Sequence, residues 1–103
     1  MSVFKKNPSS NTPQQRVVKE LTVTNKLGIH ARPAALFVKT AGRFESNISV
    51  EKDGEVVNGK SIMGLIMLAA GYGSRVKIIA EGKDAEAAIS ELEKLFERKF
   101  DEE

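Results

Sequence analysis

Two kinds of apolar spacing alternate along this chain from Val17 onward, and their order limits the possible fold more than any other feature of the sequence. Stretches with an apolar residue at every second position are typical of strands, and they lie at 17–24, 47–52, 55–57 and 75–81. Stretches with apolar residues three and four positions apart are typical of helices, and they lie at 33–41, 61–70 and 84–96. This βαββαβα order predicts an α+β fold, with a four-stranded antiparallel sheet and three helices on one face.

Residues with special backbone roles mark the ends of these elements. Pro33 fits the first turn of a helix, where its missing N–H is not needed, and Gly42 fits the end of that helix. The pair Asp53-Gly54 predicts a hairpin turn between the second and third strands. Ser61 and Asp84 are predicted to cap the second and third helices with their side chains.

The 103 residues are expected to form one domain, residues 17–103, preceded by a disordered tail, residues 1–16. The three charged residues of the tail are all basic, so the rest of a chain with a total charge of +2 is nearly neutral. A nearly neutral domain with a short basic tail is poor evidence for nucleic-acid binding, which needs a concentrated basic face. No apolar run approaches the roughly 20 residues of a membrane helix, and the start lacks the apolar core of a signal peptide. We expect a cytoplasmic protein with no direct membrane insertion.

The only histidine, His30, directly precedes the predicted first helix. The first backbone N–H groups of a helix have no partner within it and carry partial positive charge, so those of Ala31 and Arg32 suit a phosphate. A neutral imidazole is a nucleophile near pH 7, and the guanidinium of Arg32 can pair with a phosphoryl group on it. A lone histidine in this place is more commonly a cap or a surface residue, so the chemistry alone leaves these interpretations open. With no cysteine and no second histidine, we expect neither a metal nor a cofactor.

Two strings of residues resemble the signatures of one family. Residues 25–34, Asn-Lys-Leu-Gly-Ile-His-Ala-Arg-Pro-Ala, closely resemble the active-site signature of the HPr family, the phosphocarrier proteins of the bacterial phosphotransferase system. Residues 58–65, Asn-Gly-Lys-Ser-Ile-Met-Gly-Leu, resemble the second signature at the family's own spacing. The resemblance runs from about Val17 to Phe96 and implies the HPr fold, an open-faced sandwich with the element order predicted above.

The resemblance also implies a role for each residue around the histidine. His30 would take a phosphoryl group on Nδ1 from phosphorylated enzyme I, which phosphoenolpyruvate charges, and would pass it to an enzyme IIA protein of a sugar permease. Arg32 would neutralise the phosphoryl oxygens. Ala31 has no hydroxyl and would contribute only its backbone N–H. The protein would then be a covalent component of a phosphoryl relay and not an independent catalyst.

Ser61 matches the serine that HPr kinase/phosphorylase modifies in many bacteria, so this resemblance implies regulatory phosphorylation. A phosphate at a helix N-terminus is favoured by the helix dipole, and its two negative charges would oppose transfer from another phosphoprotein. Ser61 also has a purely structural interpretation, as a cap that stabilises the helix by about 1 kcal/mol. The two roles are compatible.

The second predicted helix has more apolar residues than one buried stripe requires. Leu65, Leu68 and Ala69 are expected to face the sheet, and Gly71 and Gly73 to end the helix. An exposed apolar patch beside the nucleophile suggests a docking surface, and methionine adapts to several partners. In the family the matching positions contact enzyme I and the IIA proteins. The predicted partner-binding residues are Ile62, Met63, Ile66 and Met67, bordered by Ala35 of the first helix.

Several alternatives remain open at this level. The ending at 95–103 resembles the nitrogen-related branch of the family, whereas Arg32-Pro33 and the Ser61 signature resemble the sugar branch. A purely regulatory paralogue would lack the histidine. An acylphosphatase-like enzyme would need a phosphate-cradling loop with a water-positioning asparagine, whereas the loop here carries His30. An RNA-binding sheet would need aromatic residues on its strands, and the predicted strands have none. As in the family, we expect a monomer.

Overall fold

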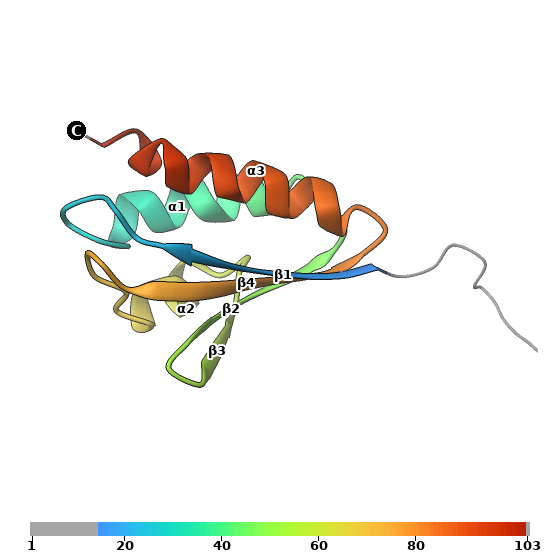
Figure 1. The fold of residues 1–103 in the computed structure, drawn as a ribbon, viewed down its shortest axis with the longest axis horizontal. Helices are drawn as coiled ribbons and strands as arrows, with labels where there is room; N and C mark the ends of the chain where they lie inside the picture. Colours follow the sequence, from blue (N-terminus) through green and yellow to red (C-terminus); the bar gives the residue numbers. More distant parts are fainter. Residues whose placement is uncertain (1–14, 103) are drawn as a thin grey trace, which may run out of the picture.

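The structure, a computed structural model, describes residues 15–102 and confirms the predicted order of strands and helices (Figure 1). The elements are β1 (Gln15–Thr22), α1 (Ala31–Ala41), β2 (Asn47–Lys52), β3 (Glu55–Asn58), α2 (Ile62–Met67), β4 (Arg75–Gly82), α3 (Ala85–Glu97) and a final turn η1 (Lys99–Asp101). The first strand begins two residues before the predicted start, because Gln15 and Arg16 pair with Gly82 and Glu81 of β4. The remainder of the predicted tail, residues 1–14, lies outside the described residues.

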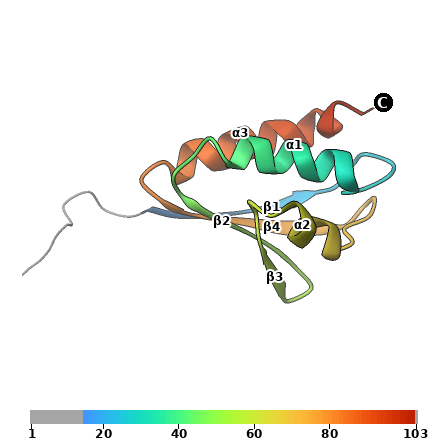
Figure 2. The ribbon, with the colours of Figure 1, turned by 180° about the vertical axis from the view of Figure 1, so that it is seen from behind.

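The four strands form one antiparallel sheet in the order β1-β4-β2-β3. Alternation along the central strands sends one set of side chains to the covered face, and these are the buried residues Ile48, Val50, Val76, Ile78 and Ala80. Helices α1 and α3 lie side by side over that face (Figures 1 and 2). Helix α2 packs against α1 and β3. The predicted open-faced α+β architecture is therefore confirmed.

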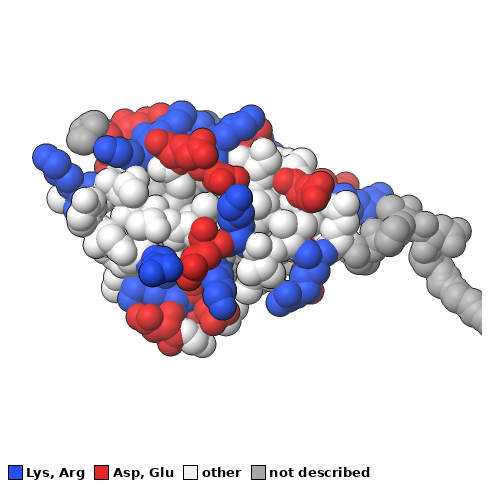
Figure 3. Space-filling view, viewed as in Figure 1, with Lys and Arg blue, Asp and Glu red and all other residues white. Residues whose placement is uncertain are grey.

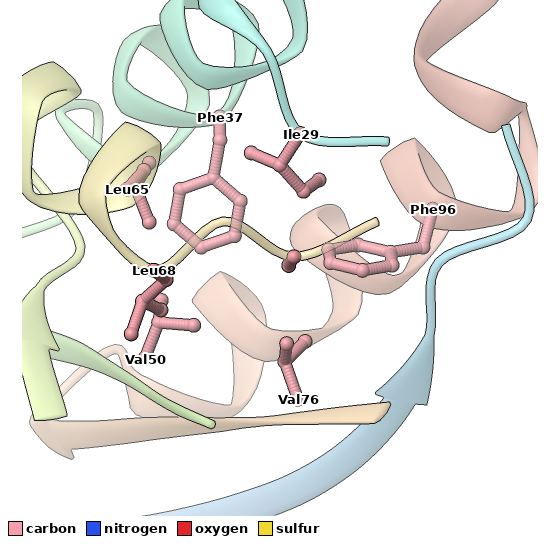
Figure 4. Close-up of a pocket in the computed structure, with 8 residues that line it drawn as sticks. Ile29, Phe37, Val50, Leu65, Leu68, Val76 and Phe96 are labelled. Atoms are coloured by element: carbon pink, nitrogen blue, oxygen red, sulfur yellow. The ribbon is translucent and has the colours of Figure 1, made fainter. Parts of the chain in front are cut away.

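The apolar stripes of the three helices meet in one core beneath the loop that carries the histidine. Figure 4 shows Phe37 of α1, Leu65 of α2 and Phe96 of α3 converging with Val76 of the sheet, under Ile29. The rings of Phe37 and Phe96 meet edge to face, with their centroids 6.3 Å apart. Because Ile29 is part of this packing, the core fixes the position of the residue that precedes His30.

Helix α2 is shorter than its apolar pattern predicts. It ends at Met67, with Leu68 as the C-cap, and Ala69 takes the left-handed conformation (φ 53°) that closes many helices. The prediction that Ala69 faces the sheet is wrong, since Ala69 is exposed and Ala70 is buried instead. The turn at Ala69 brings the Ala70 carbonyl to the backbone N–H of Ile29, at 2.8 Å. Because of this tertiary contact, α2 ends before the predicted Gly71 and Gly73.

Asp84 stands at the N-cap of α3, but its side chain does not cap that helix. Its carboxylate accepts instead from the backbone N–H of Glu45 at 2.8 Å and from the backbone N–H of Ser46 at 3.0 Å. The buried hydroxyl of Ser46 donates to the same carboxylate. These bonds, the Ser46 hydroxyl first, hold the Asp84 pKa below its usual value of 3.8. Asp84 therefore joins the start of α3 to the segment that enters β2.

We expect Asp84→Asn to lower the midpoint of thermal unfolding by about 5 °C near pH 7, because it loses the charge that these donors share. A lowered pKa in the folded state gives stability that is complete above the unfolded pKa and is lost as the pH falls through the folded one. The difference between wild type and variant should therefore hold above about pH 5 and shrink in more acidic solution. Calorimetry against pH measures it, with Asp53→Asn in the exposed β2–β3 turn as the control. Equal midpoints near pH 7 would contradict the assignment.

Candidate functional site

His30 is the N-cap residue of α1, with an extended backbone (φ −93°, ψ −165°). Its carbonyl accepts the first helical hydrogen bond, from the N–H of Ala34 at 3.0 Å. Its side chain caps nothing and is 39% exposed. The structure thus leaves the imidazole free of the structural role that a histidine at this position commonly has.

The loop before His30 depends on Gly28, whose φ of 75° favours glycine. A Cβ on Gly28 would lie only 2.7 Å from the Ala70 carbonyl oxygen. Within the loop, the Asn25 side chain donates to the Gly28 carbonyl at 2.7 Å. The turn after α2 and the histidine loop are therefore in close contact, which places the end of α2 beside the loop that carries His30.

The N-terminus of α1 offers unused donors next to the histidine. None of the backbone hydrogen bonds within residues 15–102 uses the N–H of Ala31 or Arg32, and Pro33 has no N–H. The Arg32 side chain is exposed and lines an open hollow together with Glu102. Two free N–H groups and a guanidinium thus lie together at the helix start, where an anion is expected from the sequence.

No motif in the sequence predicts the carboxylate that faces the histidine. Glu102 approaches from the C-terminal end, and its Oε2 lies 2.9 Å from His30 Nε2. Its other oxygen, Oε1, accepts from Asn25 Nδ2, also at 2.9 Å. The hydrogen bond from Asn25, followed by the one from His30 and the nearby charges, holds the Glu102 pKa below its usual value of 4.5. Glu102 is therefore ionised at neutral pH.

Glu102 reaches this position because the chain turns sharply after α3. Lys99, Phe100 and Asp101 all have positive φ, between 55° and 59°, which is costly for residues other than glycine. The Phe100 side chain is fully buried and contacts Phe96, with ring centroids 4.9 Å apart. Burial of the aromatic ring contributes about 1.5–3 kcal/mol, which offsets part of this strain, so the core helps to hold the turn that delivers Glu102.

Ser61 is the N-cap of α2, as predicted, and its hydroxyl accepts from the backbone N–H of Gly64 at 3.0 Å. The side chain is only partly buried. Its oxygen therefore caps the helix while it remains near the surface. The capping interpretation is confirmed, and it leaves room for modification.

The predicted apolar patch lies on the outer side of α2. Ile62, Met63 and Met67 are 41%, 66% and 69% exposed, and Ala35 of the contacting helix α1 is also exposed. Ile66 differs from the prediction, because it is partly buried and packs against the core. We refer to Ala35, Ile62, Met63 and Met67 together as the α2 patch. Such a group of flexible apolar side chains on the surface is typical of a docking site.

The site combines a half-exposed imidazole, unused helix N–H groups and an arginine on an open-faced α+β sandwich. Together these features define a class of small proteins that present one reactive histidine at a helix N-terminus. Residues 17–98 match the family model described as the phosphorylation-site domain of the HPr component of the phosphotransferase system. The chain belongs to the HPr phosphocarrier family.

Named relatives agree with this assignment. The chain is 52% identical to a phosphocarrier protein HPr from Treponema pallidum over 87 residues, which are 84% of this chain and 99% of the relative. It is 54% identical to the HPr-like protein Crh from Halalkalibacterium halodurans over 76 residues, which are 74% of this chain and 90% of Crh. Both the carrier and the HPr-like type thus occur among its relatives.

Solved structures share the fold. HPr-C-His from Thermoanaerobacter tengcongensis superposes with a TM-score of 0.82 at 53% identity, covering 84% of this chain and 98% of that one. An HPr from the same organism solved as a dimer superposes with a TM-score of 0.68 at 55% identity, covering 80% of this chain and 94% of that one. Both structures are of HPr proteins, in agreement with the family assignment.

Proposed function

We propose that this protein carries a phosphoryl group on His30, accepting it from phosphorylated enzyme I and passing it to enzyme IIA proteins of sugar permeases. The observation that carries the proposal is the half-exposed His30 ring beside the unused N–H groups of Ala31 and Arg32. The helix terminus stabilises a nearby anion by about 0.3–1 kcal/mol. This modest stabilisation suits a carrier, which has to release the group again.

Arg32 would pair with the phosphoryl oxygens during transfer, because its guanidinium is exposed at the open side of the site.

The protein would not be an independent catalyst, because His30 is itself consumed in one transfer and restored in the next. This work would take place in the cytoplasm, where phosphoenolpyruvate is made. The carrier would act as a monomer, since the α2 patch has to be free for successive partners.

Incubation with enzyme I, magnesium and phosphoenolpyruvate tests the proposal. We expect the intact mass to rise by one phosphoryl group, about 80 Da. The modification should be labile in acid, as a phosphoramidate is. If the enzyme I of the sugar branch gives no gain, the enzyme I of the nitrogen-related branch is the next donor, because residues 95–103 resemble that branch. No gain in mass with either enzyme I would contradict the proposal.

The structure offers little to the rival functions. The four strands contain no aromatic residue on which a base could stack. Lysines, arginines and acidic residues are interspersed on the face shown in Figure 3, which is a poor match for a polyanion. An acylphosphatase would place a positioned water where this loop places His30. The presence of His30 also argues against a purely regulatory paralogue.

We further propose that the α2 patch is where enzyme I and the IIA proteins dock, and that HPr kinase/phosphorylase modifies Ser61 to control this docking. Ser61 directly precedes the exposed residues Ile62 and Met63. A phosphate on Ser61 would place about two negative charges in an apolar contact. Docking would then either require desolvation of these charges or be prevented.

We expect Ser61→Asp to lower the rate at which enzyme I phosphorylates the protein by about an order of magnitude, because of the added charge. Aspartate and asparagine cap a helix about as well as serine, so neither Ser61→Asp nor Ser61→Asn should change stability by more than a few tenths of a kcal/mol. Rapid-quench kinetics and thermal unfolding of both variants measure the two effects. Equal slowing by Ser61→Asn would show that charge is not the cause.

A further inference from the structure

The contacts of the Glu102 carboxylate determine where the hydrogen of the His30 ring resides. An ionised carboxylate can only accept hydrogen bonds, so the 2.9 Å contact to Oε2 requires a hydrogen on His30 Nε2. In a neutral imidazole the other nitrogen, Nδ1, then has no hydrogen and keeps its lone pair. The side chain of Glu102 is 17% exposed, so water competes weakly for this carboxylate.

Asn25 fixes which way the carboxylate faces. Its side chain is fully buried, and its Nδ2 donates both to Glu102 Oε1 and to the Gly28 carbonyl. Its Oδ1 is buried without a hydrogen-bond partner among the described residues. A buried acceptor without a partner is costly, so this amide orientation is maintained at the expense of Oδ1. The unsatisfied Oδ1 therefore indicates that the site requires the two hydrogen bonds that Nδ2 donates, one to Glu102 and one to Gly28.

We propose that Glu102 and Asn25 are positioning residues that hold the His30 ring with its hydrogen on Nε2 and its lone pair on Nδ1. The inference rests on the proposed function, because it concerns the nitrogen that receives the phosphoryl group. In the transfer, the Nδ1 lone pair forms the new bond to phosphorus while the bond between phosphorus and the donor atom of enzyme I breaks, and the electron pair of that bond stays on the donor. No hydrogen has to leave Nδ1. The ring gains a positive charge that faces the Glu102 carboxylate, and it loses that charge when the group is passed on.

The substitution Glu102→Gln separates this role from simple packing, because it keeps the shape of the side chain. Asn25 Nδ2 still needs an acceptor, so the amide oxygen of the new glutamine should turn toward Asn25. Its NH₂ group then faces His30 Nε2 and can only donate to it. The ring should respond by moving its hydrogen to Nδ1, which is the nitrogen that must attack.

The tautomer is measured directly by long-range ¹H–¹⁵N spectra of the neutral ring, and the signals are unambiguous because His30 is the only histidine. We expect the Nε2–H form in the wild type and a shift toward the Nδ1–H form in Glu102→Gln. Phosphoryl acceptance from enzyme I should slow about tenfold, the effect of losing one charge-assisted hydrogen bond. Asp101→Asn is the control, since it removes a charge from the adjacent residue, which pairs with Arg98 and not with His30.

The outcomes separate this inference from the proposed function. An unchanged tautomer population in Glu102→Gln overturns the inference, as does an unchanged rate of acceptance alongside a changed tautomer. An equal tautomer shift in Asp101→Asn also overturns it, because the effect would then be one of net charge. If wild type and Glu102→Gln show the expected tautomers but the wild type never accepts a phosphoryl group, the result contradicts the proposed function alone.

Discussion

His30→Ala is expected to abolish phosphorylation by enzyme I completely, with no acid-labile gain in mass at any time of incubation. No other imidazole exists in the chain, so no side chain can replace the nucleophile at the N-terminus of α1. The unused N–H groups of Ala31 and Arg32 would remain, but an N–H group can only donate a hydrogen bond to a phosphoryl group and cannot form a covalent bond to phosphorus. The expected loss is therefore total and not a reduction in rate.

His30→Gln provides the matched control for structure. The glutamine amide can donate to Glu102, as the imidazole does, but it is not a nucleophile. Both variants should unfold at nearly the wild-type temperature and should still be substrates of a kinase at Ser61, whose phosphoserine is stable in acid. An acid-labile gain of mass in either variant would show that His30 is not the phosphoryl carrier.

Phe100→Ala is expected to have the largest effect on stability, a loss of about 3–5 kcal/mol in the free energy of unfolding. Its ring is fully buried against Phe96, and truncation leaves a cavity at the end of the core. The left-handed conformations of Lys99 and Asp101 would then lose the packing that offsets their strain. We therefore also expect Glu102 to leave His30, with a change in the ring tautomer that resembles that of Glu102→Gln.

Urea denaturation measures the loss, and an unchanged slope with denaturant would show that the folded state is otherwise intact. Tyr72→Ala removes an aromatic ring that is exposed in the turn before β4 and serves as the control, with an expected effect within about 0.5 kcal/mol. A loss below about 1 kcal/mol for Phe100→Ala would mean that the C-terminal turn is held by other contacts.

Local patterns predicted most elements because the spacing of apolar residues reports which side of an element is buried. The second strand was predicted with its observed bounds, and Ser61 was correctly predicted as a cap. Both features depend on residues within a few positions of one another. The errors occurred where distant segments compete for a group. The Asp84 carboxylate is bound to Ser46, and α2 ends early because Ala70 pairs with Ile29.

The candidate site likewise contains residues that the sequence predicts and residues that it does not. His30, Arg32 and the N–H of Ala31 are contiguous, so their grouping at a helix start could be predicted from the sequence. Three of the four apolar residues predicted on the outside of α2 are exposed, and Ile66 is partly buried because it packs against the core. Asn25 and Glu102 gave no signal, since a carboxylate 72 residues after the histidine has no fixed relation to it in sequence.

The sequence by itself determined the order of strands and helices, the single histidine at the start of α1 and the family to which the chain belongs. These follow from periodicity and from contiguous residues, which local physics interprets directly. Only the tertiary structure decided which carboxylate faces that histidine and which ring nitrogen it engages. That contact depends on a left-handed turn held by Phe100 and on a buried Asn25, and packing between distant segments determines both.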